Sequence, residues 1–219
     1  IISPASLCDN WAAECSRWLG VARIKPVVLV SGPKAARTAF DFATCPPQQL
    51  LITSYETFKS HAESLRSAPI GLIICDEGHR LKNSAGNATS AALRSIENAR
   101  RIILTGTPVQ NDLDELWALC DFASPGALPP LATFRSVFAV PLEVAQRAGA
   151  TDEQKQLAVV RGAELKRLYN RLVQTRDRSV IEASLPARRE LVLCCALSPA
   201  QVALYECALT QLKREHSGG

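Results

Sequence analysis

The residues best suited to chemistry are the neighbouring acids Asp76 and Glu77, which directly follow the apolar run Leu72–Cys75. The apolar run predicts a buried strand, so both carboxylates emerge at its carboxyl end. Mg²⁺ prefers oxygen ligands and takes one or two carboxylates while it keeps several waters. Asp76 is therefore a candidate for holding Mg²⁺ through water, and Glu77 for activating the water that attacks a γ-phosphate. A solvated acidic turn at a strand end is the alternative interpretation.

A second apolar run, Ile102–Leu104, leads into the small residues Thr105–Thr107. If both strands belong to one parallel sheet, their carboxyl ends lie at the same edge. Threonine hydroxyls there could hydrogen-bond Glu77 or His79 and sense the state of a bound nucleotide. Gly106 permits a close approach of the backbone. An ordinary loop between a strand and a helix is the alternative interpretation.

The elements that must position these residues follow from the pattern of apolar residues. In the first half of the chain, short and almost continuously apolar runs alternate with amphipathic stretches of helical period. This pattern indicates a parallel sheet covered on both faces, which is a doubly wound α/β architecture. Ligands of such sheets bind beyond the carboxyl ends of the strands. The predicted strands are 1–3, 27–30, 49–53, 70–75 and 101–105, and the predicted helices are 6–19, 34–43, 55–66 and 87–98.

The second half of the chain has a different, mainly helical pattern. A helix with an acidic first turn is predicted to begin after Asn111. A turn rich in proline and glycine follows over 122–130, and a longer helix is predicted over 151–173. Strand character over 188–197 precedes a last helix that opens at Ser198-Pro199.

Composition limits the classes of protein that the chain can be. It has 219 residues, 47% of them apolar and 21% charged, which suits a large domain with a sizeable core and is too apolar for disorder. The formal charge of +4 permits a nucleic-acid partner without requiring one. No apolar run approaches the roughly 18 residues of a membrane span, so no membrane partner is expected. The chain contains no methionine, so we expect it to be a piece of a longer protein.

Four segments, in order along the chain, resemble motifs Ia, Ib, II and III of the Snf-type helicase-like ATPases of helicase superfamily two. Within that family, Cys75–Ser84, Thr53–Phe58 and Leu193–Pro199 look most like the recombination-repair, or RAD-type, translocases. The four matching segments are Ile2–Leu7 with the nearby Asn10-Trp11 and Trp18–Gly20, then Leu51–Phe58, Asp76–Asn83 and Leu104–Asn111.

The resemblance implies a fold and a division of the chain. The fold would be a RecA-like doubly wound parallel sheet, the first of two ATPase lobes, truncated at its N-terminus and followed by a helical C-terminal extension. We expect a partial ATP-binding lobe over 1–125, a helical protrusion and linker over 126–187, and a strand and helix over 188–219 that lead toward a second lobe. The family's basic pair before the lobe boundary has displaced counterparts in Arg176 and Arg178, and which of them performs the family's role stays open.

The resemblance also implies an activity. Members of the family use ATP and Mg²⁺ to drive tracking along double-stranded DNA, usually without separating its strands, in the nucleus. Their pathways are DNA repair and recombination or chromatin remodelling, so the partners would be a recombinase filament or chromatin proteins. Two other functions stay open, a catalytically dead DNA- or protein-binding remnant and a strand-separating helicase. The residues that follow Glu77 point away from the helicase.

Matching positions assign roles to individual residues by resemblance. Asp76 and Glu77 match the family's Mg²⁺-holding and catalytic-base positions. Arg80 and Lys82 either face DNA or belong to a solvated surface. The positions that match residues coupling hydrolysis to DNA are His79, Thr105, Gly106, Thr107 and Gln110. The positions that match segments touching the DNA backbone are Ser3, Pro4, Thr53, Ser54 and Tyr55.

Two parts of the family's catalytic machinery are not found in this sequence. It contains no G-x-x-x-x-G-K-[ST] phosphate loop, and the resemblance ends before a second lobe that would carry an arginine finger. An arginine finger contributes about 10³- to 10⁵-fold in rate in related NTPases. We therefore expect that the 219-residue chain alone does not hydrolyse ATP measurably.

Overall fold

Five short strands form one sheet in the order β2-β3-β1-β4-β5, and every pair of neighbours is parallel. Parallel neighbours need a crossover connection, and a helix lies in each crossover here. This arrangement confirms the predicted doubly wound α/β fold. The strands are β1 (Ile2–Ser3), β2 (Val27–Leu29), β3 (Leu51–Ser54), β4 (Leu72–Cys75) and β5 (Arg100–Ile103).

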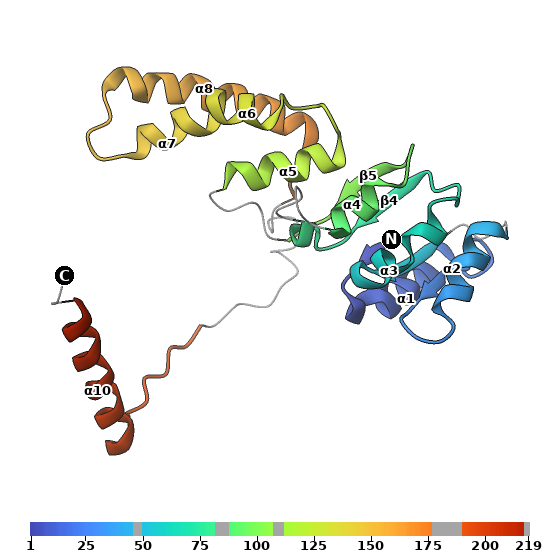
Figure 1. The fold of residues 1–219 in the computed structure, drawn as a ribbon, viewed down its shortest axis with the longest axis horizontal. Helices are drawn as coiled ribbons and strands as arrows, with labels where there is room; N and C mark the ends of the chain where they lie inside the picture. Colours follow the sequence, from blue (N-terminus) through green and yellow to red (C-terminus); the bar gives the residue numbers. More distant parts are fainter. Residues whose placement is uncertain (46–49, 82–87, 107–111, 177–189, 217–219) are drawn as a thin grey trace. The chain divides into compact units, whose positions relative to one another are not determined.

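The computed structural model describes residues 1–45, 50–81, 88–106, 112–176 and 190–216. It divides into two units, Ile1–Gln174 and Thr175–Gly219. The first unit contains the sheet with its helices, and the second contains helix α10 (Pro199–His216) (Figure 1). Within the described ranges, no helix is both long and apolar enough to cross a membrane.

The crossover helices cover both faces of the sheet. The chain moves across the sheet in one direction from β1 to β2, and in the opposite direction in each later step. Right-handed crossovers therefore place α1 on one face and α2, α3 and α4 on the other. In agreement, α3 packs beside both α2 and α4. These helices are α1 (Cys8–Leu19), α2 (Ala35–Thr44), α3 (Tyr55–Leu65) and α4 (Ala88–Arg94), with 3₁₀ turns η1 (Ala5–Leu7) and η2 (Gly78–Leu81).

Helix α5 (Leu113–Ala123) contributes to two apolar cores. Phe122 and Leu119 join the main core against the sheet, where Phe122 has no exposed surface. Cys120 joins a second core, with Leu116 and Trp117 packed against it. Because one helix completes both cores, the protrusion that follows α5 is part of the same unit as the sheet.

The protrusion consists of α6 (Leu131–Phe134), a π-helical segment η3 (Arg135–Ala139), α7 (Val140–Gln146) and α8 (Asp152–Leu172) (Figure 1). Helix α8 agrees with the prediction over 151–173, and Thr151 begins it with a capping box that includes Gln154. The helices over 131–146 were not predicted. A π-helical turn breaks the 3.6-residue period and Pro141 falls inside the stretch, so the helical pattern was not visible.

One predicted strand and the predicted face of one helix differ from the structure. The described part of the predicted strand over 188–197 has no strand, and Leu191, Val192 and Leu193 are exposed. A strand needs a hydrogen-bonded neighbour, and apolar composition alone does not provide one. The apolar spacing of the predicted helix 6–19 places Trp18 on the same face as Cys15, but Trp18 is 76% exposed, and Cys8 and Cys15 are the buried residues of α1.

A test of the packing at the end of β4 uses two glycines. A Cβ atom at buried Gly78 would overlap the side chain of Ile103 in β5, whereas one at Gly71 would meet no atom within 4 Å. We expect Gly78→Ala to lower the free energy of unfolding by about 1–3 kcal/mol, the usual cost of overpacking. We expect Gly71→Ala not to lower it. Urea unfolding of both variants measures the difference, and equal stabilities would contradict the packing of η2 on β5.

Candidate active site at the carboxyl ends of the strands

Backbone hydrogen bonds join the carboxyl ends of β1, β4 and β5 around Asp76. The N–H of Asp76 donates to the carbonyl of Ile2 at 2.7 Å, and the N–H of Leu104 donates to the carbonyl of Cys75 at 2.8 Å. The N–H of Gly78 in turn donates to the carbonyl of Leu104 at 2.9 Å. Asp76 and the residue after it therefore leave the sheet between β1 and β5, at the edge where parallel sheets bind ligands.

Three further hydrogen bonds hold Asp76, and they come from three parts of the chain. The indole Nε1 of Trp11 in α1 donates to Oδ2 of Asp76 at 2.9 Å, and the backbone N–H of Glu77 donates to Oδ1 at 2.9 Å. The hydroxyl of Tyr55, the first residue of α3, donates to the carbonyl of Asp76 at 2.6 Å. Both carboxylate oxygens and the backbone of Asp76 are thus anchored.

The anchored carboxylate of Asp76 still fits a metal site. An ionised carboxylate offers about four lone-pair positions, and the hydrogen bonds from Trp11 and Glu77 use one on each oxygen. Hard oxygen donors suit Mg²⁺, which keeps several of its waters in protein sites. Asp76 is half-buried at a strand end, where water-mediated contact with a metal is possible. Its surroundings therefore suit the role predicted from the sequence.

Glu77 has a left-handed backbone conformation with a φ of 50°. This conformation costs a residue that has a Cβ about 1–2 kcal/mol, and residues strained in this way cluster at functional sites. The N–H of Arg80 donates to the carbonyl of Glu77 at 3.1 Å, which helps to hold the turn. The side chain of Glu77 is 40% exposed, and its Oε2 lies 3.2 Å from Nδ1 of His79. The turn therefore keeps this carboxylate accessible next to Asp76.

His79 links the ends of β4 and β5. Its Nδ1 lies 3.5 Å from Oγ1 of Thr105, which is the contact between the two strand ends that the sequence predicted. Gly106 is exposed, and a Cβ there would meet no atom within 4 Å. Thr107 and Gln110 lie outside the described residues. The described members of the predicted coupling set therefore lie together at this edge.

Four residues of the segments predicted to touch DNA have buried side chains. Ser3 and Thr53 have no exposed surface, and the Thr53 hydroxyl donates to a carbonyl of β2 at 2.9 Å. The Ser54 hydroxyl caps α3 by accepting a backbone N–H at 3.1 Å, and the Tyr55 hydroxyl is bonded to Asp76. A buried hydroxyl with an internal partner is not available to a phosphate. These side chains make internal hydrogen bonds at the strand ends.

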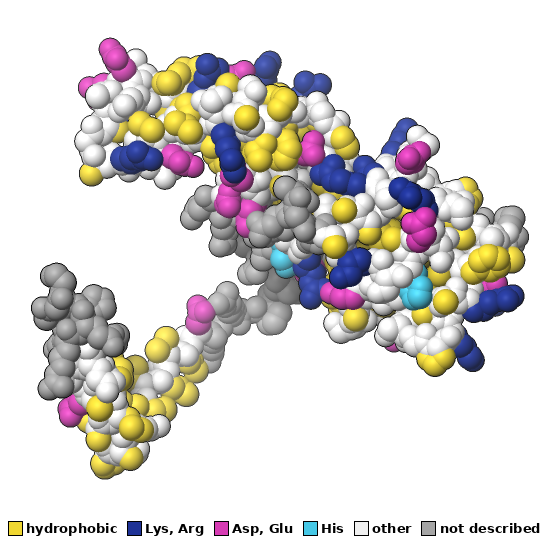
Figure 2. All heavy atoms as spheres, in the orientation of Figure 1, with side chains coloured by type: hydrophobic (Ala, Val, Ile, Leu, Met, Phe, Trp, Pro, Cys, Tyr) yellow, Lys and Arg dark blue, Asp and Glu magenta, His cyan; other side chains and the backbone are white. Residues whose placement is uncertain are grey.

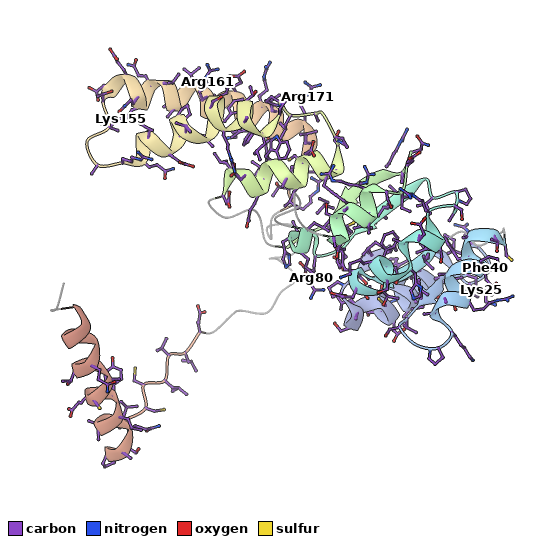
Figure 3. The ribbon with its side chains drawn as sticks, viewed as in Figure 1. Lys25, Phe40, Arg80, Lys155, Arg161 and Arg171 are labelled. Carbon is purple, nitrogen blue, oxygen red and sulfur yellow. The ribbon has the colours of Figure 1, made fainter. Side chains whose placement is uncertain are left out.

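The other predicted DNA contacts are nearer the surface. Pro4 is half-exposed just before η1, and Arg80 is exposed in η2 (Figure 3), where its Nη1 lies 3.6 Å from Oε1 of Glu56. Arg176 belongs to the second unit and donates to the carbonyl of Thr175 at 3.3 Å. On the face shown in Figure 2, basic and acidic side chains are interspersed over the described part of Ile1–Gln174, so charge alone does not mark a nucleic-acid surface on that face. The predicted residues outside the described ranges are Lys82 and Arg178.

Sequence reasoning missed the two aromatic residues that hold Asp76. Trp11 was assigned to the predicted helix 6–19 near motif Ia, and Tyr55 to a segment that touches DNA. The partners lie 65 and 21 positions apart along the chain, so no local spacing connects them. The one available signal was chemical, because a Trp or Tyr near a core needs a partner for its N–H or O–H.

The model of the SNF2-related domain family matches residues 1–217. The chain belongs to this family. It is 39% identical to the DNA repair and recombination protein RAD54-like of Gallus gallus and 37% identical to that of Homo sapiens, each over 97% of this chain. It is 38% identical to the DNA repair protein rhp54 of Schizosaccharomyces pombe over 96% of this chain. The chain spans only 30%, 29% and 25% of these three relatives.

Solved structures of the same family show the same fold. The Sulfolobus solfataricus SWI2/SNF2 ATPase core in complex with dsDNA matches 100% of this chain with a TM-score of 0.62 and 24% identity. The Sulfolobus solfataricus SWI2/SNF2 ATPase core domain matches 97% of this chain with a TM-score of 0.60. This chain covers 42% and 40% of those chains. The predicted RecA-like lobe is confirmed as a fold, and the chain is an SNF2-related domain similar in sequence to RAD54 repair and recombination proteins.

The hydroxyl of Tyr55 gives a test at alkaline pH. Burial, with nearby Cys75 and Asp76 as smaller causes, raises the pKa of Tyr55 far above its ordinary value. Above about pH 10 the unfolded chain loses this proton and the folded protein keeps it, so stability falls as the pH rises. Tyr55→Phe should cost about 1 kcal/mol at pH 7 through the lost hydrogen bond and should flatten the decline above pH 10.

Urea unfolding of the wild type and Tyr55→Phe between pH 7 and pH 11 measures both effects. Burial also raises the pKa of the Cys75 thiol, to about 12, and the Tyr55 hydroxyl is one of the groups that lower it. The difference between the two proteins therefore reports the Tyr55 hydroxyl together with its effect on Cys75. Parallel curves with equal stabilities would contradict the hydrogen bond to Asp76.

Proposed function

We propose that this chain forms the first lobe of an ATP-driven double-stranded-DNA translocase that acts in DNA repair and recombination or in chromatin remodelling, in the nucleus. The observation that carries the proposal is the cluster of Asp76, Glu77, His79 and Thr105 at one edge of the sheet. An ATP-hydrolysing site needs a group that holds Mg²⁺ and a group that positions the attacking water, and two neighbouring acids can serve as these groups. The contact between His79 and Thr105 joins them to the neighbouring strand. The relatives' names support the pathway, and the dsDNA complex of the SWI2/SNF2 core supports duplex DNA as the track.

The two acids divide the chemistry at this edge. When bound, Mg²⁺ neutralises charge on the phosphate oxygens of ATP. Asp76 would hold it through water, with its carboxylate fixed by hydrogen bonds on both oxygens. Glu77 polarises the attacking water and accepts its proton, while the nearby His79 restrains the glutamate side chain.

The link between β4 and β5 would couple hydrolysis to DNA. His79 and Thr105 are 3.5 Å apart, so a shift of Glu77 on hydrolysis reaches the segment after β5 through His79. By resemblance, that segment continues the coupling set in Gly106, Thr107 and Gln110.

Duplex DNA would be held through its phosphates and without reading of the bases. The groups proposed for this contact are Pro4, Arg80 and Lys82, with backbone N–H groups beside Ser3 and Ser54 at the strand ends. Such contacts position a protein on DNA without specifying sequence, which suits a motor that tracks along it. A recombinase filament or chromatin proteins are the proposed protein partners.

A catalytically dead DNA- or protein-binding remnant is the second candidate. The lack of a phosphate-loop motif within these 219 residues permits this alternative without favouring it. The conformation of Glu77 argues against it. A site without catalysis gains nothing from a strained glutamate, and a glycine there would remove the strain.

The base assignment is tested in the full-length protein. Glu77→Gln keeps the shape of the side chain but removes the proton acceptor, so duplex-stimulated ATP turnover should fall by at least about 100-fold while ATP and DNA binding persist. Glu63→Gln is the matched control, because Glu63 is 91% exposed in α3, where its Oε2 lies 3.8 Å from Nη1 of Arg66. Turnover that survives in Glu77→Gln would show that Glu77 is not the base.

A second test compares the full-length protein with the 219-residue chain alone. The full-length protein should hydrolyse ATP faster with duplex DNA, whereas the chain alone should show no measurable turnover, since its sequence has no phosphate-loop motif. A coupled ATPase assay with and without duplex DNA measures both. Duplex-stimulated hydrolysis by the chain alone would contradict the prediction.

A further inference from the structure

We propose that Trp11 is a positioning residue for the metal-holding carboxylate of Asp76, so that helix α1 takes part in divalent-cation binding without touching the cation. The inference rests on the proposed function, because it concerns the same site. It assigns a role to a residue that neither holds the metal nor activates water.

The contact between the side chains of Trp11 and Asp76 is a hydrogen bond with a defined donor and acceptor. Nε1 of Trp11 lies 2.9 Å from Oδ2 of Asp76. An indole N–H can only donate and an ionised carboxylate can only accept, so the direction of the bond is fixed. A hydrogen bond to a charged acceptor is about twice as strong as one between neutral groups. Both residues are half-buried, which limits competition from water.

The hydrogen bond on the other carboxylate oxygen, Oδ1, shows why the Trp11 bond sets the orientation of the Asp76 carboxylate. Oδ1 accepts the backbone N–H of Glu77 at 2.9 Å, and that N–H belongs to a turn whose backbone is already fixed. One hydrogen bond on Oδ1 leaves the carboxylate free to rotate about it. The bond from Trp11 to Oδ2 fixes the plane of the carboxylate, and with it the direction of the lone pairs that remain for the waters of a cation.

Trp18 provides a matched control on the same helix. It is 76% exposed, and its Nε1 donates to Oε2 of Glu14 at 2.6 Å on the surface. Substituting phenylalanine at Trp11 or Trp18 removes the same indole N–H from α1. Only the change at Trp11 removes a hydrogen bond to the acids at the end of β4.

The experiment uses the full-length protein with Trp11→Phe and Trp18→Phe. Electron paramagnetic resonance of Mn²⁺ in the presence of a non-hydrolysable ATP analogue measures cation affinity directly. Partners that orient a metal-binding group typically contribute about 10- to 100-fold in metal affinity. We expect Trp11→Phe to weaken Mn²⁺ binding by about tenfold and Trp18→Phe to leave it within about twofold of the wild type, in the range of neutral surface changes. Half-maximal turnover in Trp11→Phe should need more Mg²⁺, and saturating Mg²⁺ should restore most of the rate.

An Asp76→Asn background shows whether Trp11 acts through Asp76. Once the carboxylate is gone, adding Trp11→Phe should change Mn²⁺ affinity by less than about twofold, as expected when one residue acts only through the other. An equal weakening by Trp11→Phe in both backgrounds would overturn the inference, as would Mn²⁺ affinity that is the same in Trp11→Phe and Trp18→Phe. Loss of turnover that Mg²⁺ does not restore, with a lowered melting temperature, would show a general structural role and would also overturn it. If the wild type shows no duplex-stimulated turnover, the proposed function fails, and Mn²⁺ affinity still decides the role of Trp11.

Discussion

The hydrogen bond from the N–H of Asp76 to the carbonyl of Ile2 fixes the level at which β4 ends beside β1, and the site depends on that level. Ile2 is in register with both Thr53 of β3 and Cys75 of β4, so the three strands end next to one another. The residue that follows each strand therefore reaches the same edge of the sheet. A slip of β4 by one residue would turn its side chains to the opposite face and separate Asp76 from its partners.

Internal polar contacts keep this edge rigid while one turn stays strained. The hydroxyl of Thr53 donates a hydrogen bond to a carbonyl of β2, and the hydroxyl of Tyr55 donates one to the backbone carbonyl of Asp76. Burial keeps the pKa of Cys75 high, so its thiol stays neutral directly before the two acids. Among the described residues of this edge, the left-handed backbone conformation falls at Glu77, where the chain leaves the strand. A site built in this way positions its first acid firmly and presents the second to solvent.

The sequence contained the information for the sheet and for the location of the site, because both follow from local patterns. The apolar runs that precede Asp76 and Thr105 predicted that these residues lie at strand ends. Parallel pairing of β4 with β5 places the two strand ends side by side, where His79 contacts Thr105. Burial of the hydroxyls at Ser3 and Thr53 was not predictable, since the same residue types serve exposed loops and sheet interiors. The contact of Trp11 with Asp76 depends on how α1 packs against the sheet, and the two residues are 65 positions apart, which no spacing rule expresses. The strand expected over 188–197 was inferred from apolar composition alone. Its described part has no neighbouring strand to pair with and forms no strand.

The most direct test of this account is a structure of the full-length protein bound to duplex DNA, Mg²⁺ and a transition-state analogue of ATP hydrolysis. The account predicts that Asp76 contacts the Mg²⁺ through water, with the Trp11 hydrogen bond kept, and that Glu77 lies next to the water in line with the γ-phosphate position. A cation held by other residues, or a Glu77 carboxylate turned away from that water, would contradict it.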